Sequence, residues 1–261
     1  MRAIWNGAIG FGLVNIPIKI YAATETSKLD LDMLDSKDLS NIQFKRVNAR
    51  TGKEVTWENI VKGYLMEDRY VVLEDKDFAA ALPEKTKILS IDQFVKEEEV
   101  DSVYFENPYF LEPQKSGETA YRLLLHALLD TGMAGIGTFV LRESEAIGMI
   151  RPYNEEVLML QRLRFAEEVR DYSDLKLPAK KAPKPAELKM AKNLIEQLSE
   201  PFDPTLYKDN YADALLKIIN QKAKGKTVRA KKAATPDKGK VVDLMAQLKA
   251  SLQTKKRKTS S

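Results

Sequence analysis

The chain has 261 residues, of which 44% are apolar, and this is enough to bury a sizeable core. It contains no cysteine, which excludes a disulfide framework, a thiolate zinc site and a thiol nucleophile. No apolar run approaches the roughly 20 residues that cross a bilayer, and no signal-peptide pattern begins the chain, so the sequence predicts a cytoplasmic protein without a membrane partner.

Charge is distributed unevenly along the chain. The formal net charge of +4 combines a basic end, where residues 222–261 hold thirteen lysines and arginines against Asp237 and Asp243, with a body of 29 basic and 36 acidic residues. A basic tail of this kind is attracted to phosphate polyanions, but a disordered end that only solubilises the protein has the same composition. The composition leaves both interpretations open.

The first 165 residues are dominated by patterns typical of β-strands. Residues 2–23 are rich in β-branched and aromatic residues, and residues 42–57 predict a hairpin in which Gly52 supplies an irregular turn conformation. Further strands are predicted at residues 69–73, 86–95, 104–111, 136–142, 146–151 and 157–165, with one helix at 117–130 among them. The sequence therefore predicts a mainly β (α+β) fold whose core is a β-barrel with a hairpin bridge.

The C-terminal third is predicted to be a helical arm followed by a tail. Residues 177–185 hold three prolines and no apolar periodicity, which predicts a stiff linker. Apolar residues recur at helical spacing over 187–198, and a second helix over 204–220 is predicted to begin after Asp203 with Pro204 in its first turn.

The composition of the last forty residues predicts disorder over 222–240, followed by an apolar stripe at 241–252 that makes only a marginal helix on its own. The predicted organisation is a barrel core at 1–174, a linker at 175–186, a helical C-terminal module at 187–222 and an extended lysine-rich tail at 223–261.

Residues suited to catalysis are scarce. The single histidine, His126, lies in an apolar helical pattern and is interpreted as a core or interface residue rather than a catalytic one. Gly7, Gly10 and Gly12 match no nucleotide-binding motif and favour strand bulges or close packing. The acidic run at 97–101 is capable of holding a metal but is more often a solvated face.

Basic residues on the predicted β elements are the main candidates for a binding site. Each alone is usually a solvated surface charge, and only their clustering favours contacts with DNA. The candidates on the body are Lys45, Arg46, Arg50, Lys53, Lys62, Arg142 and Arg151. The candidates in the tail are Lys222, Lys224, Lys226, Arg229, Lys231, Lys232, Lys255, Lys256, Arg257 and Lys258.

Several collinear segments carry a resemblance to a known family. They are residues 1–7, 11–21 and 44–47, followed by 53–55, 60–64, 69–73, 108–113 and 164–170. These segments resemble prokaryotic Ku proteins, which bind DNA ends in bacterial non-homologous end joining, and the resemblance covers roughly residues 1–222. Some relatives place a cysteine pair at the hairpin turn, where this chain has Asn48, Arg50 and Gly52, so a metal site is not available there.

The resemblance implies a β-barrel in each subunit and a two-fold homodimer that closes a ring around double-stranded DNA ends without reading their sequence. It also implies a nucleoid-associated, non-enzymatic protein without a cofactor, which recruits and stimulates an ATP-dependent ligase of the DNA ligase D type. The predicted partner-binding residues on the second helix are Tyr207, Tyr211, Leu215 and Ile219, although an amphipathic helix of this kind also packs on its own body.

Two other functions fit the residues. One is a metal-dependent nuclease that uses the acidic run at 97–101, and the other is an architectural DNA binder driven by the basic tail. A nuclease would cleave labelled linear DNA in Mg²⁺ or Mn²⁺, and a tail-driven binder would not distinguish linear from circular duplexes.

Overall fold

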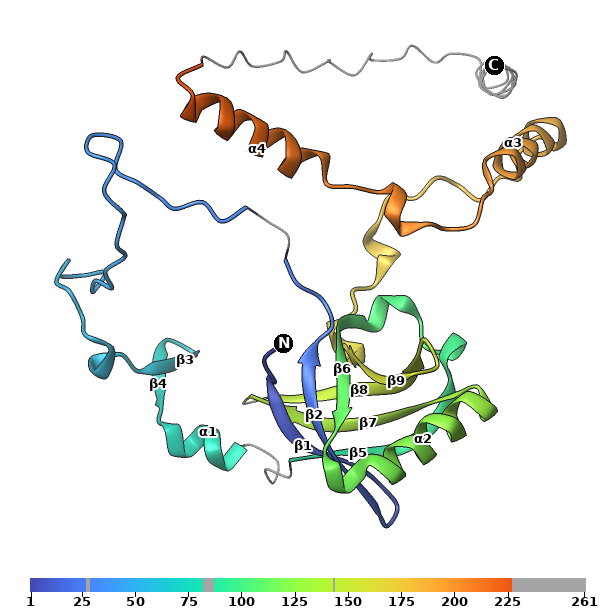
Figure 1. Cartoon of the computed structure of the whole chain (residues 1–261). Coiled ribbons are helices and arrows are strands. Elements are labelled where there is room, and N and C mark those ends of the chain that lie inside the picture. The colour runs from blue at the N-terminus through green and yellow to red at the C-terminus, as the bar shows by residue number, and fades with distance from the viewer. Residues whose placement is uncertain (27–28, 82–86, 143, 227–261) are drawn as a thin grey trace. The chain divides into compact units, whose positions relative to one another are not determined.

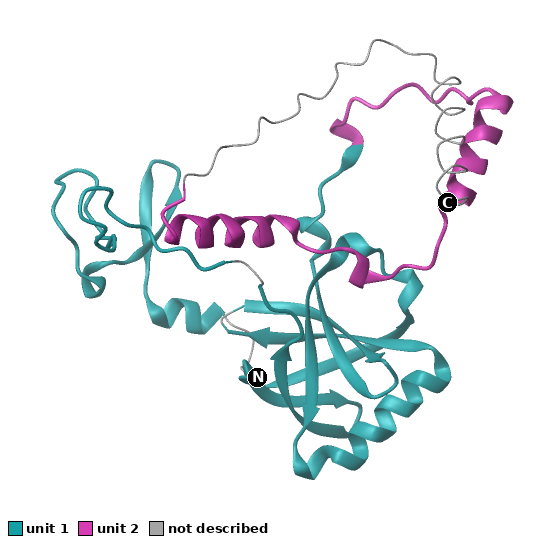
Figure 2. Cartoon of the chain, turned by 45° about the horizontal axis from the view of Figure 1, so that its top comes forward, with its two compact units in different colours: residues 1–172 teal, residues 173–261 magenta. Residues whose placement is uncertain are grey.

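The computed structural model describes residues 1–26, 29–81, 87–142 and 144–226. The chain divides into two compact units, residues 1–172 and 173–261, which Figure 2 shows in different colours. In the described ranges no helix is both long and apolar enough to span a membrane.

Unit 1 is built on a closed seven-stranded barrel, which confirms the predicted fold (Figure 1). The strands follow the order β1-β2-β6-β9-β8-β7-β5, and every pair is antiparallel except β1 with β5, which closes the barrel in parallel. They are β1 Trp5–Phe11, β2 Val14–Ala22, β5 Ile88–Lys96, β6 Phe105–Pro113, β7 Met133–Leu141, β8 Ser144–Tyr153 and β9 Val157–Leu163. Each barrel strand predicted from the sequence is present, with ends shifted by a few residues.

The barrel core follows from the alternation of apolar residues along its strands. Ile16, Ile18 and Ile20 of β2 are at most 1% exposed, because alternate side chains of a strand point to the same face. They pack in one cluster with buried leucines of β6 and β9 such as Leu111 and Leu158. Burial of this apolar surface is the main stabilising contribution to the barrel.

Helix α2, Glu118–Thr131, packs against the barrel (Figure 1), where it contacts β2, β7 and β8. Its buried residues recur at helical spacing and are Tyr121, Leu124, Leu125 and Leu128. Gly132 ends the helix in the left-handed conformation, with φ of 66°. His126 was predicted to be a core or an interface residue. The core alternative is wrong, because His126 is on the exposed face of α2, and the interface alternative stays a prediction.

Tyr121 connects α2 to the barrel through its hydroxyl group. The hydroxyl donates to the carbonyl of Leu111 at 2.8 Å and accepts from the amide of Leu158 at 2.6 Å, where β6 and β9 pair. Burial raises the pKa of Tyr121, so the hydroxyl keeps the proton that it donates. The contact therefore fixes the helix over the end of the β6–β9 ladder.

A long excursion, defined as residues 23–87, separates β2 from β5. It contains the two-stranded sheet of β3, Lys62–Met66, and β4, Arg69–Leu73, followed by helix α1, Asp75–Ala81. The sequence predicted β4 but not β3 or α1. No described residue of the excursion is buried.

The predicted hairpin at 42–57 is only partly formed. It contains no strand, and its pairing is reduced to one isolated bridge between Val47 and Glu54. Gly52 has φ of 67°, as the turn prediction required. The ladder is short because no neighbouring strand or buried side chain supports it within the described residues.

Unit 2 contains helices α3, Pro185–Leu198, and α4, Asn210–Ala223, preceded by residues 175–184, which form neither helix nor strand. The prediction that the second helix begins at Pro204 is wrong. Asp203 caps only a short 3₁₀ turn, Pro204–Leu206, where it accepts from the amide of Thr205 at 2.9 Å. The α-helix begins later because the carboxylate of Asp209 accepts from two amides of its first turn.

Candidate nucleic-acid interface

The turn at residues 46–55, called here the basic hairpin, is held by backbone and side-chain hydrogen bonds. The amide of Asn48 donates to the carbonyl of Lys53 at 2.8 Å, and the amide of Gly52 donates back to the carbonyl of Asn48 at 2.9 Å. The side-chain oxygen of Asn48 accepts from the amides of Arg50 and Thr51. Asn48 therefore fixes a turn whose cationic side chains remain in solvent.

The cations on and beside this hairpin have two kinds of environment. Lys45 pairs with Glu54 at 2.7 Å, and the guanidinium of Arg46 lies 4.4 Å from the centre of the Trp57 ring. Arg50 and Lys53, at the turn, are exposed, and their cationic side chains make no ion pair or hydrogen bond with any residue that the structure describes. These two are available to an external anion.

Positive charge is concentrated in this part of the excursion. Residues 41–64 hold five lysines and arginines against Glu54 and Glu58, although the body of the chain is acidic overall. Lys62, the fifth of these cations, lies on β3 with its ammonium 4.6 Å from the centre of the Phe78 ring of α1. Exposed lysines and arginines of this kind suit contacts with the phosphates of a nucleic-acid backbone, and such contacts do not read the base sequence.

The structure places Arg142 beside a second arginine that the sequence did not single out. Arg142 lies in the turn between β7 and β8 with φ of 63°, and it lines a hollow of about 420 Å³ together with Arg162 of β9. Arg162 is held by Glu106, with Nε 3.0 Å from Oε2. The only feature of the sequence that could have pointed to Arg162 is its positive charge within the mostly apolar run of β9.

Arg151 forms an ion pair with the acidic run at 97–101, one of the metal-site candidates in the sequence. Its guanidinium is 3.2 Å from Glu97, and its side chain is 24% exposed. This ion pair connects β8 to the 3₁₀ turn Glu97–Glu99, so the arginine has a structural partner already. Across the described ranges, no three histidine, aspartate or glutamate side chains gather where they could hold a metal ion.

The predicted partner-binding residues lie on and just before α4. Tyr207 precedes the helix and stacks on Phe202 with ring centres 5.8 Å apart. Tyr211 is 75% exposed, Leu215 is half-buried and Ile219 is exposed on the helix itself. No residue of α4 is buried, so its apolar stripe is not covered by any residue that the structure describes.

The candidate tail residues fall at the limit of the described chain. Lys222 is in the last turn of α4, Lys224 follows the helix, and Lys226 is the final described residue. The others lie outside the described residues, and they are Arg229, Lys231, Lys232, Lys255, Lys256, Arg257 and Lys258.

Comparison with known proteins gives one consistent family. The Ku70/Ku80 beta-barrel domain matches residues 10–190. The chain is 42% identical to the non-homologous end joining protein Ku of Opitutus terrae, over 97% of this chain and 91% of that protein. It is 37% identical to the protein of that name from Pseudomonas aeruginosa, over 97% and 89%, and 35% identical to that of Bacillus subtilis, over 98% and 83%.

Proposed function

The chain belongs to the Ku β-barrel family, and on that basis we propose that it binds the ends of double-stranded DNA in non-homologous end joining. The observation that carries the proposal is the basic hairpin, where Arg50 and Lys53 have no ionic partner in the described chain and Arg46 is held over Trp57. Such cations contact phosphates and read no bases, so binding is independent of sequence. The protein acts as a clamp and not as an enzyme.

A competition between linear and covalently closed circular duplexes of equal mass tests this function. A closed ring reaches duplex DNA only over an end, so we expect the circle to compete at least about tenfold more weakly than the linear duplex, since end-specific binding exceeds non-specific binding by a large factor. The measurement is displacement of a labelled linear fragment at physiological salt. Equal competition by the circle would refute the clamp and favour an architectural binder.

We further propose that the clamp is a homodimer assembled through the excursion. Both faces of the β3–β4 sheet carry exposed apolar side chains: Tyr64 at 69% and Val71 at 39% share one face, while Tyr70 at 71% and Val72 at 52% share the other. An isolated two-stranded sheet is marginally stable, and exposed apolar surface of this extent is typical of an interface. A two-fold ring requires a second copy of the chain, and we assign that copy to the exposed apolar surface of the β3–β4 sheet.

Replacing Tyr70 and Val72 together by glutamate should dissociate this dimer, because it places two charges in an apolar interface. Light scattering should then give one 29.6 kDa chain instead of twice that mass. The matched control replaces Leu13 and Leu123, which are exposed apolar residues of the barrel and α2, by glutamate. A wild-type protein that is already monomeric, or a control that dissociates equally, would contradict the assignment.

We propose that α4 contributes to the recruitment of an ATP-dependent ligase of the DNA ligase D type. The support is its apolar stripe, on which Tyr211 and Ile219 are exposed and Leu215 is half-buried, together with the exposed Tyr207 before the helix. Replacing Tyr211 and Leu215 by alanine should reduce the stimulation of end ligation by about tenfold, since buried tyrosines of an interface each contribute about 1–2 kcal/mol or more, while end binding is unchanged. Stimulation equal to that of the wild type would remove α4 from the partner surface.

The basic tail is proposed to add contacts with phosphates along the duplex. Thirteen cations against two anions over residues 222–261 give it the charge for this, and each contact adds about 0.9 to the slope of log K against log salt. The tail therefore increases affinity for longer DNA without selecting ends.

A further inference from the structure

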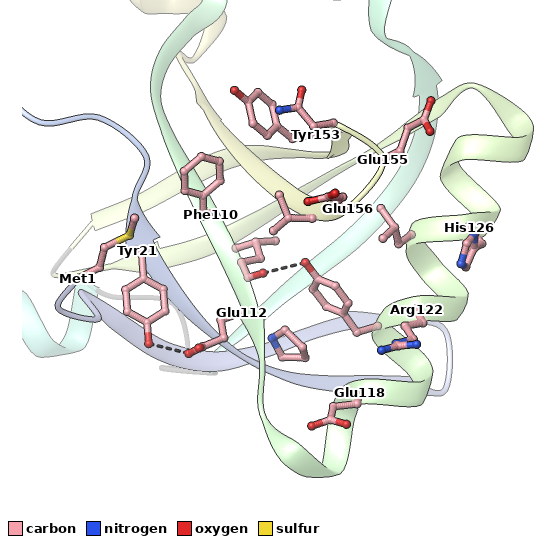
Figure 3. A pocket seen from close by; sticks show the side chains of 16 residues that line it. Met1, Tyr21, Phe110, Glu112, Glu118, Arg122, His126, Tyr153, Glu155 and Glu156 are labelled. Atoms are coloured by element: carbon pink, nitrogen blue, oxygen red, sulfur yellow. Dashed lines mark hydrogen bonds between the residues drawn. The ribbon is translucent and has the colours of Figure 1, made fainter.

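A large cleft lies between α2 and the barrel, on residues that the proposed function does not use. Its volume is about 1010 Å³, which exceeds what a drug-sized ligand needs. Strands β2 and β6 form one side, α2 forms the other, and the turn between β8 and β9 lies at its edge (Figure 3). All of these elements belong to unit 1.

Aromatic side chains line the barrel side of the cleft. Phe110 and Tyr153 form a pair with ring centres 5.5 Å apart, and Tyr153 is 38% exposed. Tyr21 also lines the cleft, and its hydroxyl donates to Glu112 at 2.6 Å (Figure 3). The faces of such rings attract cations, most strongly where water is partly excluded.

The charge of the cleft is predominantly negative. Figure 3 shows the glutamates that line it, Glu112, Glu118, Glu155 and Glu156. Among the described residues, Arg122 is the only lysine or arginine in the lining. Lys19 approaches Glu112 from outside at 4.0 Å. The other three glutamates of the lining make no ion pair with any described residue, and they are Glu118, Glu155 and Glu156.

Aromatic rings next to unpaired carboxylates complement a cation and repel a phosphate backbone. We propose that this cleft docks a short lysine- or arginine-bearing segment of a partner protein, with its cations over Phe110 and Tyr153 and against Glu155 and Glu156. The peptide site is distinct from the basic hairpin, so one protein segment and DNA are bound at the same time. The choice of a partner over the chain's own tail rests on the proposed function, in which the tail is occupied by DNA.

Fluorescence polarisation of the full-length protein, without DNA, tests the cleft. The probe is a fluorescein-labelled peptide of lysines and arginines around one tryptophan, and the control probe has glutamate at every cationic position. We expect only the cationic probe to bind. Glu155→Lys with Glu156→Lys should weaken its binding by at least about tenfold, because two attractions become repulsions.

Two further variants separate the contributions of charge and aromatic surface. Glu155→Gln with Glu156→Gln should weaken binding less than the reversal, and Tyr153→Ala should weaken it several-fold. The matched control is Glu98→Lys with Glu145→Lys, which reverses two exposed carboxylates outside the cleft and should bind like the wild type. Unchanged binding by the Glu155 and Glu156 reversal, or an equal loss in the control, would overturn the proposal.

A tail variant distinguishes a partner from the chain's own cations. Lys255, Lys256, Arg257 and Lys258 are replaced by glutamine in the full-length protein. Equal affinity for the probe in this variant and the wild type supports an external partner. A tenfold or greater gain would show that the tail occupies the cleft, and it would overturn the partner assignment without affecting the test of DNA-end binding.

Discussion

Replacing Arg46, Arg50 and Lys53 together by glutamate should weaken binding of a short linear duplex about a hundredfold at 0.15 M salt. If each residue contacts one phosphate, the slope of log K against log salt should fall by about 2.7 units, from about 0.9 per contact. At 0.15 M salt, losing the counterion release of three phosphate contacts lowers the affinity by about two orders of magnitude. The change should be the same for any DNA sequence, because phosphate contacts position the protein and do not specify bases.

The matched control for this variant reverses three other exposed cations of the excursion that lie outside both the basic hairpin and the β3–β4 sheet, Lys37, Lys76 and Lys87. The net charge changes by the same amount, so a general loss of attraction would weaken both variants equally. Binding is measured over a series of salt concentrations, and light scattering establishes that both variants remain dimers. Equal slopes for the two variants would remove the basic hairpin from the DNA site.

Gly137→Ala should destabilise the barrel by about 3 kcal/mol, which is at the upper end for added volume in a packed core. Gly137 lies in β7 opposite Ile91, and a Cβ there would overlap the carbonyl of Ser90 and lie 2.9 Å from the Cα of Ile91. Because the obstruction is backbone and not a flexible side chain, rotamer changes cannot relieve it. Strands β5 and β7 would have to separate, and the thermal midpoint should fall by roughly 6–12 °C.

Gly63→Ala is the control for this substitution. Gly63 also lies in a strand, β3, but its nearest neighbour for an added Cβ is 3.5 Å away on Tyr70, an ordinary contact. Replacement of a strand glycine without overlap is neutral or slightly stabilising, because alanine restricts the unfolded chain. Calorimetry of both variants measures the difference, and similar midpoints would contradict the close approach of β5 and β7.

The sequence by itself determined the strands of the barrel and the helix against it. Ile16, Ile18 and Ile20 alternate as one face of a half-buried strand must, and the buried residues of α2 recur at helical spacing. These patterns depend only on neighbours along the chain, so they can be recognised in the sequence without a structure. The glycine turn of the basic hairpin was also predicted, since a positive φ at Gly52 is a local requirement.

Features that depend on residues distant in sequence were decided by the tertiary structure. Strand β3 was missed because its residues, Lys62–Met66, show no alternation of polar and apolar side chains. The pairing of Arg151 with Glu97 joins residues 54 positions apart, and the cleft gathers side chains from β2, β6, α2 and the β8–β9 turn. Closure of the barrel brings these segments together. The apolar periodicities of strands and helices, two and 3.6 residues, show only which side of each element is buried. They do not show which distant elements pack against one another.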